Sequence, residues 1–406
     1  MKIVFLTPEY VPYVGGISHV TKEFADELAV LGHEVVVITR NLTKSDKFEV
    51  RESGVKVHRL PHLFSFSAYI SYVFFSIMVF WKLLFLKADL VHSQSFLPLG
   101  IVSGIYSSIF SKTLSVTQGH GKDINKELVG SRILRPLSRF AIRKNDVVFA
   151  LCNYHGRLIE EYSGVKAKLL ANGVDLEKGL LNDGVDLPRV FLRSKDYSGR
   201  RVVHLLFVGR LIKRKGADIL LESARLVLND QKFNSKFDLK IHIIGEGPEY
   251  LSLKQLASDL RIELKVFFHG NMDSLKVLSY MKACDTFVFP THKEAFGLVV
   301  LEAMKMKLPI ICSKENDVGG PVDILENGKT ALLVDRTAKS FAQGIMQIFD
   351  LDIGEKGSGE SSLEESGSYF RNKLSKNAFE TVMLKYSWNA ISKGYLNIIS
   401  EEKKRN

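Results

Sequence analysis

The sequence predicts an α/β protein of two domains, each a doubly wound parallel sheet with helices on both faces. Two observations favour this fold class. A chain of 406 residues is too long for one ordinary hydrophobic core and suits two. Short apolar runs of strand length alternate with amphipathic stretches of helix length. This alternation indicates βαβ units, and therefore parallel strands joined by right-handed crossovers.

The predicted N-terminal domain begins with a βαβ unit. Residues 2–6 and 33–40 are apolar runs typical of buried strands, and residues 16–32 between them have apolar side chains at helical spacing. Pro8 and Glu9 end the first run, so we expect a strand here and not a secretory signal peptide. Four more strand-like runs follow, each opening into a loop: ADLVHSQ, TLSVTQGHG, NDVVFAL and AKLLANGVD.

A second series of strand-like runs forms the predicted C-terminal domain: RVVHLLFVGR, LKIHIIGEG, LKVFFHG, DTFVFPT and LPIICS. The segment before it lacks periodicity and contains Gly, Pro and Asp, as linkers do. We therefore expect an N-terminal domain at 1–178, a linker at 179–200 and a C-terminal domain at 201–385. A C-terminal helix at 386–406 is expected to pack back toward the N-terminal domain. Ligands of such sheets bind beyond the carboxyl ends of the strands, so we expect the site in a cleft between the domains.

Cysteine content and charge restrict the class of protein. Cys152, Cys284 and Cys312 are widely spaced and form no C-x-x-C pair, which favours a reducing compartment and disfavours a zinc site. The net charge of +11 calls for an anionic partner. The sequence has no interleaving of aromatic and basic residues, so we do not expect a nucleic acid. An anionic small substrate and an anionic membrane surface both fit.

Two segments do not follow the α/β alternation. Leu63–Trp81 is an uncharged apolar run of nearly membrane-spanning length, but strand-like segments flank it on both sides. We therefore expect a buried helix, or one in partial contact with lipid, in place of a transmembrane span. Asp352–Ser368 is rich in Gly, Ser and Glu and is expected to be a surface loop. The only D-x-D, Asp350 to Asp352, borders this loop, so we do not expect a metal-bridged diphosphate.

Two glutamates stand in the otherwise apolar stretch HKEAFGLVVLEAM. Glu294 lies in the loop before a predicted helix, and Glu302 lies about two turns inside it. Eight helical residues advance by about 12 Å, so the two acids are too far apart to act on one bond. Each can instead accept hydrogen bonds from neighbouring hydroxyls, while the helix N-terminus between them suits phosphate. This order of groups describes a nucleotide sugar. The alternative is that Glu302 pairs with a lysine and Glu294 faces solvent.

Two cations follow the first strand of the C-terminal domain. Arg210 and Lys215 lie in the turn of FVGRLIKRKGADILL, at the end of that strand. Fixed cations beside a leaving diphosphate would stabilise the negative charge that develops as the sugar departs. The alternative is a solvated basic turn, which would also account for Lys213 and Arg214.

Glycines stand at three strand ends. Gly209 ends the first strand of the C-terminal domain, and Gly245 and Gly247 follow its second strand, where small residues let a nucleotide approach the backbone. Gly15 and Gly16 lie between the first strand and the first helix of the chain, in a position suited to phosphate. The full G-x-G-x-x-G spacing is missing there, which disfavours a dinucleotide.

His120 is the candidate side chain for the reacting sugar in the N-terminal domain. It follows the strand TLSVTQG, and Asp123 lies three residues further on. A neutral imidazole can donate to or accept from a substrate hydroxyl. The alternative is a histidine whose hydrogen bonds go to local backbone.

A basic amphipathic helix is predicted over SRILRPLSRFAIRKN. Its arginines recur at helical spacing, and apolar side chains cover much of the remaining surface. Such a helix suits an anionic lipid surface, and Leu63–Trp81 could assist. The alternative is a solvated charged face over an ordinary core. The arginines expected on the acceptor or membrane face are Arg132, Arg135, Arg139 and Arg143.

Taken together, these motifs resemble the retaining glycosyltransferases of family 4, also called group 1. The resemblance is carried by GGISHV, GHGKD, NGVD, VGRLIKRKG, GEGPE and EAFGLVVLEAM, which cover nearly the whole chain in the expected order. It implies the GT-B fold of two Rossmann-like domains, a nucleotide-activated donor and no obligatory metal or other cofactor. The family usually has glycine where Lys307 stands in EAMKMKLPI.

The resemblance also implies roles for the candidate residues. Glu294 would contact the donor sugar and Glu302 the ribose, while Arg210 and Lys215 would hold the diphosphate. His120 would lie near the reacting carbon. Backbone contacts to the donor are expected from one loop of each domain, at Gly16, Phe296, Gly297 and Leu298.

We therefore expect a metal-independent hexosyltransferase that moves a hexose from a UDP- or GDP-sugar to an acceptor hydroxyl with retention. The acceptor could be a membrane lipid or a growing glycan, and the enzyme would be cytoplasmic, at the membrane face. Two alternatives stay open at this point. One is a non-catalytic nucleotide-sugar-binding protein on the same fold. The other is a nicotinamide-dependent oxidoreductase, which the incomplete glycine fingerprint disfavours.

Overall fold

The structure is a computed structural model that describes residues 1–13, 15–43, 45–61, 68–177, 191, 195–314, 319–349 and 363–405. It consists of two compact units. Unit 1 comprises Met1–Asp175 together with Tyr386–Asn406, and unit 2 comprises Leu176–Lys385. Most of the expected linker, the start of the apolar run at Leu63 and the D-x-D motif lie outside the described residues. The expected cleft between the domains stays a prediction.

Unit 1 is built on an eight-stranded sheet in the order β3-β4-β2-β1-β5-β6-β7-β8. Every neighbouring pair is parallel except β3 and β4, an antiparallel pair at one edge. Sequential strands run outward in both directions from β1, so the strand order switches between β1 and β5. The strands are β1 (Lys2–Leu6), β2 (Glu34–Arg40), β3 (Phe48–Val50), β4 (Lys56–Leu60), β5 (Leu90–Ser93), β6 (Leu114–Gly119), β7 (Val147–Ala150) and β8 (Lys168–Leu169).

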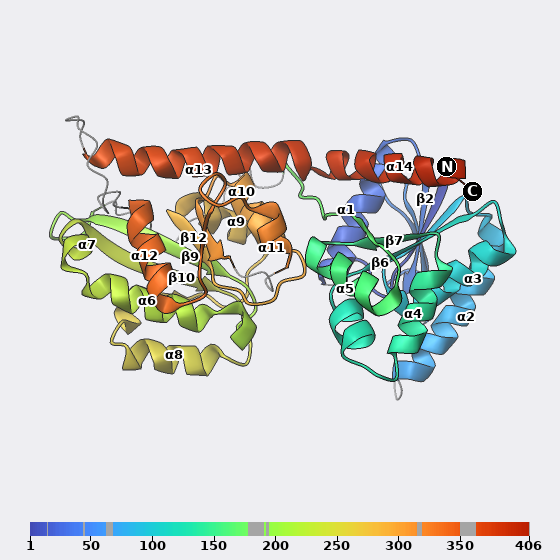
Figure 1. Ribbon diagram of the computed structural model, residues 1–406, viewed down its shortest axis with the longest axis horizontal. Helices are drawn as coiled ribbons and strands as arrows, with labels where there is room; N and C mark the ends of the chain where they lie inside the picture. The colour runs from blue at the N-terminus through green and yellow to red at the C-terminus, as the bar shows by residue number, and fades with distance from the viewer. Residues whose placement is uncertain are drawn as a thin grey trace. The chain divides into compact units, whose positions relative to one another are not determined.

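Helices cover this sheet and supply its core (Figure 1). Phe75, Val79 and Leu83 of α2 are buried against Val4 and Val36 of the central strands. The stripe of apolar side chains at every fourth position explains why the segment is helical and why it lies on the sheet. The helices are α1 (Gly16–Val30), α2 (Ala68–Leu86), α3 (Ile101–Ile109), α4 (Arg135–Lys144), α5 (Asn153–Ser163) and α14 (Trp388–Arg405), with π-helical segments η1 (Phe96–Gly100) and η2 (Asp123–Val129).

The last helix of the chain, α14, belongs to unit 1. Its Trp388 stacks on Phe24 of α1 at 5.9 Å between ring centroids. Tyr395 is fully buried and its ring stacks on that of His92 in β5. The Tyr395 hydroxyl oxygen lies 3.1 Å from His92 Nδ1, within hydrogen-bonding distance. Two large aromatic side chains on one face of α14 therefore fix it in the core of unit 1.

Unit 2 is built on a six-stranded parallel sheet in the order β11-β10-β9-β12-β13-β14. The strand order switches between β9 and β12, and the candidate residues cluster at the carboxyl ends of these strands. The strands are β9 (Arg201–Val208), β10 (Phe237–Ile244), β11 (Val266–Phe268), β12 (Thr286–Phe289), β13 (Ile310–Ser313) and β14 (Leu332–Val334). The predicted class, two doubly wound parallel α/β sheets, is confirmed.

The helices of unit 2 include one that the sequence analysis missed in part. Residues 363–368 were expected in a surface loop, but they form the first turns of α13. This expectation was wrong because it was based on the Gly and Ser content of the segment. The helix-forming residues that continue to residue 385 extend the helix into it. The helices are α6 (Ala217–Asn229), α7 (Gln231–Lys236), α8 (Tyr250–Asp259), α9 (Ser274–Ala283), α10 (Leu298–Lys305), α11 (Gly320–Ile324), α12 (Ala338–Phe349) and α13 (Leu363–Lys385), with 3-10 turns η4 (Lys213–Lys215) and η5 (Glu263–Lys265).

A chain of imidazole rings runs through the core of unit 2. His204 Nδ1 lies 3.0 Å from His242 Nε2, and His242 Nδ1 lies 3.0 Å from His269 Nε2. Tyr280 Oη lies 3.3 Å from His269 Nδ1 and extends the chain. Burial lowers the pKa of all three histidines, that of His242 to about 3. The rings are therefore neutral at pH 7, and each can donate at one nitrogen and accept at the other.

We predict that this histidine chain makes unit 2 sensitive to acid. Below about pH 6.5 the histidines bind protons in the unfolded chain but not in the folded one, so stability falls as the pH drops from 6.5 toward 3. Urea denaturation at a series of pH values should show that His242→Gln reduces this slope by up to about 1.4 kcal/mol per pH unit. Leu251→Gln, which changes an exposed side chain of α8 and no titrating group, should leave the slope unchanged. An unchanged slope in His242→Gln would contradict the prediction.

Candidate active site

The carboxyl ends of β9 and β12 bring two of the predicted residues into contact. Lys215, at the end of η4, forms an ion pair with Glu294, which follows β12. Both side chains are largely buried, and the Lys215 ammonium also lies 5.1 Å from the centre of the Phe289 ring. The pair is thus held in a partly desolvated position at the edge of the sheet. Glu294 is not a solvated surface acid, contrary to the alternative left open by the sequence.

The backbone around Pro290 is packed tightly between the loops of two neighbouring strands. Gly216 has φ +76°, and a Cβ there would lie 2.2 Å from the Pro290 carbonyl oxygen. The Arg336 side chain, just after β14, donates from Nε to the same oxygen at 2.9 Å and from Nη2 to Lys213 O at 3.4 Å. One carbonyl therefore connects the loops that follow β9, β12 and β14.

The loop after β13 holds Glu294 itself. Gly320 N donates to Glu294 O at 3.1 Å, and Glu294 forms a parallel bridge with Gly319. A Cβ at Gly320 would lie 2.2 Å from Phe296 Cα, so this contact requires glycine. Arg336 and Gly320 were missed by the sequence analysis, because their contacts depend on the order of the strands in the sheet.

The glycines that follow β9 and β10 pack backbone against backbone. A Cβ at Gly245 would lie 2.0 Å from Gly209 O, and one at Gly247 would lie 2.2 Å from Leu211 O. Leu211 N also donates to Glu246 O at 2.9 Å. The close approach of the two loops thus explains why glycine is needed at positions 245 and 247. A contact between this backbone and a nucleotide stays a prediction.

The N-terminus of α10 lies directly after the Glu294 loop. Gly297 is the N-cap residue with φ +88° and has no side chain that could cap this end, and Leu298 is the first helical residue. Phe296 is buried beneath it, and Glu302 is half-buried inside the helix. The positive end of α10 thus lies beside the Lys215–Glu294 pair, which suits phosphate.

Arg210 differs from Lys215 in its surroundings. It follows β9 directly, and its side chain is exposed. Among the described residues, its guanidinium has no ion-pair partner. Cys312 ends up near the ion pair as well, but burial raises the pKa of its thiol to about 12, so it stays a neutral apolar side chain.

In unit 1, the loop between β1 and α1 carries Gly15 and Gly16. Gly15 is the N-cap residue of α1 in an extended conformation, and a Cβ there would lie 3.1 Å from the Glu9 carboxylate. A Cβ at Gly16 would meet nothing within 4 Å. The fold itself therefore does not require glycine at position 16.

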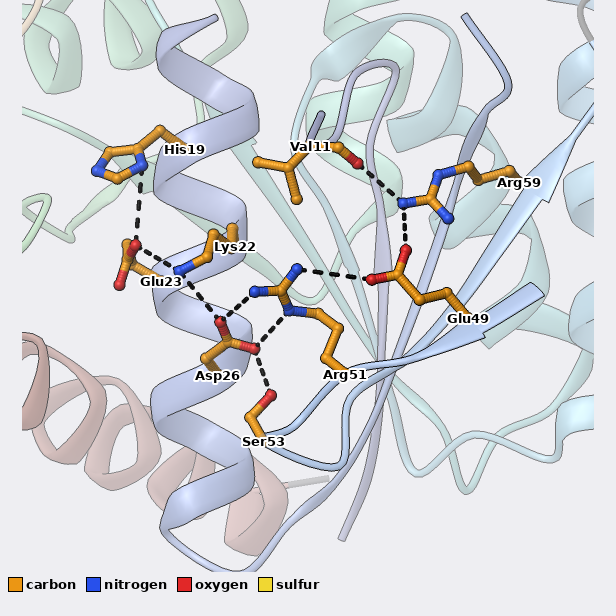
Figure 2. Close-up of polar contacts among 9 residues, drawn as sticks. All are labelled: Val11, His19, Lys22, Glu23, Asp26, Glu49, Arg51, Ser53 and Arg59. Carbon is orange, nitrogen blue, oxygen red and sulfur yellow. Dashed lines mark hydrogen bonds and ion pairs between the residues drawn. The ribbon is translucent and has the colours of Figure 1, made fainter. Parts of the chain in front are cut away.

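Arg59 of the edge strand β4 contacts this glycine loop, and Arg51, just after β3, contacts helix α1 (Figure 2). The buried Arg59 donates from Nη2 to Val11 O at 2.9 Å and pairs with Glu49 at 2.6 Å. Arg51 donates from Nε to Asp26 of α1 at 3.1 Å, and also pairs with Glu49. Polar contacts thus fix both the loop and the helix that follows it.

His120 lies at the carboxyl end of β6, next to the loop after β5. Its Nε2 lies 2.6 Å from Gln94 Oε1, and its backbone N donates to Asp123 at 2.9 Å. Burial lowers the pKa of His120 to about 4, so the imidazole is neutral at pH 7. With Nε2 donating to Gln94, Nδ1 carries the lone pair and can accept from a hydroxyl.

The four arginines of the predicted basic helix differ in their contacts and exposure. Arg135 donates to two carbonyls at the end of η2, at 3.0 and 2.7 Å, and Arg143 donates to Ser163 O at 2.8 Å. Arg132, Arg139 and Arg143 are exposed, whereas Arg135 is half-buried. Two of the four guanidinium groups therefore hold unit 1 together, and a lipid contact could use the other two.

Comparison with known proteins identifies the family. Residues 14–178 match "Glycosyltransferase Family 4", and residues 199–361 match "Glycosyl transferases group 1". The chain belongs to glycosyltransferase family 4. It is therefore a glycosyltransferase with a nucleotide-sugar donor, and the oxidoreductase alternative is wrong.

Relatives and solved structures agree with this assignment. The N-acetyl-alpha-D-glucosaminyl L-malate synthase of Bacillus anthracis is 27% identical over 91% of this chain and 94% of its own. The phosphatidylinositol N-acetylglucosaminyltransferase GPI3 subunit of Saccharomyces cerevisiae is 23% identical over 90% and 78%. A sucrose-phosphate synthase structure from Thermosynechococcus elongatus superposes with a TM-score of 0.74 at 18% identity, covering all of both chains. A lipopolysaccharide outer core galactosyltransferase gives 0.68 at 17%, covering 99% of this chain and all of its own. These likenesses confirm the GT-B fold.

This glycosyltransferase keeps a left-handed turn where the family usually has glycine. Lys307 adopts φ +55°, and its ammonium lies 4.5 Å from the centre of the Phe379 ring. A lysine in this region is strained by roughly 1 kcal/mol relative to glycine, and the cation–π contact offsets part of that cost. Lys307 thus adopts a backbone conformation that glycine favours.

We predict that Arg336 of the glycosyltransferase positions the Lys215 and Glu294 loops. Arg336→Gln removes the bridge between Pro290 O and Lys213 O, and small displacements of reacting groups are costly, so kcat should fall about tenfold or more. Arg336→Lys, which keeps one donor, should retain more of the activity. Steady-state kinetics with a verified donor give the measurement. Lys314→Gln, whose exposed pair with Asp335 lies in the same region, is the control. A change confined to thermal stability would contradict a positioning role.

Proposed function

We propose that this glycosyltransferase moves a hexose from a UDP- or GDP-sugar to an acceptor hydroxyl, with retention at the anomeric carbon. The observation that supports this most is the Lys215–Glu294 pair beside the N-terminus of α10. A cation, a carboxylate and the positive end of a helix lie together there, and these are the groups that a diphosphate and a sugar would require.

The ion pair suggests how donor binding is coupled to sugar recognition. The diphosphate would take over the Lys215 ammonium, and Glu294 would then be free to accept hydrogen bonds from sugar hydroxyls. Arg210, exposed at the end of β9, would add a second cation, and Glu302 would accept from the ribose diol.

The transfer step itself is mainly one of charge stabilisation. The bond between the anomeric carbon and the diphosphate oxygen breaks, and its electron pair goes to that oxygen. The acceptor oxygen bonds to the same face of the carbon, and its proton passes to the leaving phosphate. Lys215 and Arg210 would stabilise the departing charge, and His120 would hold a sugar hydroxyl through its unprotonated nitrogen. No protein nucleophile is needed.

For the acceptor we propose a membrane lipid or a growing glycan, reached at the cytoplasmic face of a membrane. One relative, the GPI3 subunit, acts on phosphatidylinositol according to its name. The net charge of +11 favours an anionic surface. The three cysteines are free thiols, which is consistent with a reducing compartment. Within the described residues, no helix is long and apolar enough to cross a bilayer.

Binding of radiolabelled UDP-, GDP- and ADP-sugars tests the donor assignment directly. We expect saturable binding of a UDP- or GDP-sugar, together with slow hydrolysis of that donor when no acceptor is present. Binding without any hydrolysis or transfer would support the non-catalytic alternative. Failure of every nucleotide sugar to bind would refute the proposed function.

The two cations give a sharper prediction. Arg210→Ala and Lys215→Ala should each lower kcat by about 10²–10³, because each removes charge stabilisation from the leaving group. Lys213→Ala is a matched control, since this lysine lies in the same turn but is exposed and pairs with Asp218. Thermal melting should show that all three variants fold. Wild-type rates in both test variants would refute the assigned roles.

A further inference from the structure

The helix α2 is apolar on two opposite faces. One face is buried against the sheet through Phe75, Val79 and Leu83. The opposite face is exposed, and 60% of Trp81 and 79% of Phe85 are accessible to solvent. The exposed stripe extends over about 22 Å of helix. Its large apolar side chains are Ile70, Val73, Phe74, Ile77, Trp81 and Phe85.

The next helix, α3, continues this exposed apolar surface. Tyr106 of α3 donates from its hydroxyl to Leu83 O at 3.2 Å, and its ring lies 6.3 Å from that of Phe80. The two helices are therefore in direct contact on unit 1 (Figure 1). Ile109 and Phe110 at the end of α3 are exposed as well. We call these exposed side chains of α2 and α3 the α2–α3 face.

Basic side chains accompany the α2–α3 face, and acids are nearly absent. Lys82 and Lys87 lie on and just after α2, and Lys112 follows α3. Between residues 53 and 122 the sequence holds one acid, Asp89. Its carboxylate accepts from the backbone N of Lys2 at 2.7 Å, in the sheet and not on this face. The surface is thus apolar with a positive margin.

We propose that the α2–α3 face docks on an anionic lipid bilayer. A helix with an exposed stripe of aromatic and aliphatic side chains can lie in the interfacial plane with that stripe among the acyl chains. Trp81 suits the headgroup level, and the lysine stems can reach outward to lipid phosphates. The proposed function explains why the enzyme would bind a membrane, and the proposal rests on it in that respect alone. Docking itself requires neither the donor nor turnover.

A second copy of the chain fits this face less well than a bilayer does. A symmetric dimer through α2 and α3 would bring equivalent lysines of the two copies together, since such an interface uses the same surface twice. The described residues of this segment include a single acid, Asp89, whose carboxylate already accepts from the Lys2 backbone.

The inference moves the membrane contact from α4 to α2 and α3. The sequence analysis assigned lipid binding to four arginines, of which Arg135 and Arg143 hold internal carbonyls. The apolar run of α2, expected only to assist, would instead supply most of the binding free energy through buried apolar area. Charge would contribute selectivity for anionic lipid.

Liposome flotation with the full chain tests the proposal. Wild type should float with phosphatidylcholine–phosphatidylglycerol vesicles and much less with phosphatidylcholine alone, and added salt should weaken binding. Trp81→Ser combined with Phe85→Ser should lower the partition coefficient about tenfold or more, because two apolar side chains no longer enter the bilayer. Lys87→Gln combined with Lys112→Gln should weaken binding to the mixed vesicles only.

Two controls separate docking from folding and from catalysis. Val30→Ser combined with Val50→Ser alters side chains that are 73% and 56% exposed on α1 and β3, so it should float as wild type does. Glu294→Gln should also float normally, whatever its activity. Equal flotation of wild type and Trp81→Ser/Phe85→Ser would overturn the proposal. So would a wild-type dimer in light scattering that this double variant dissociates, with no vesicle binding.

Discussion

The Pro290 carbonyl oxygen is the point on which the geometry of unit 2 depends. Gly216 can approach it because it has no side chain, and Arg336 donates to it from the loop after β14. Together these contacts fix the backbone between β12 and α10, and with it the position of Glu294 against Lys215. Because the ion pair is partly desolvated, a shift of this loop would leave a charge without its partner, which costs more than a surface pair would.

In both units, arginine side chains donate to the backbone or side chains of segments at the strand ends, and in unit 2 glycine also shapes the loop. In unit 1, Arg59 and Arg51 bind the loop and helix around Gly15 and Gly16. In unit 2, Arg336 binds the loops around Gly216. Arginine suits this task because its guanidinium stays charged and can donate in several directions at once. The result is a rigid backbone at positions where a ligand would need preformed N–H groups and cations.

The sequence predicted the fold class well because buried parallel strands and amphipathic helices have different periodicities. It also placed Lys215 and Glu294 at strand ends, and the parallel sheet brings such ends to one edge. Arg336 could not be found in this way, because its contact with Pro290 depends on the strand order β9-β12-β13-β14. Nor could spacing alone show that Arg135 and Arg143 donate to backbone carbonyls of unit 1. The exposure of Trp81 likewise depends on which face of α2 meets the sheet.

Hydrogen–deuterium exchange with and without saturating UDP or GDP is the most direct test of the central claim, that the carboxyl edge of the unit 2 sheet binds a nucleoside diphosphate. The account predicts slower exchange of backbone amides at residues 209–216 and 294–302 with one of the two nucleotides. Exchange that slows elsewhere while both of these segments stay unchanged would contradict it.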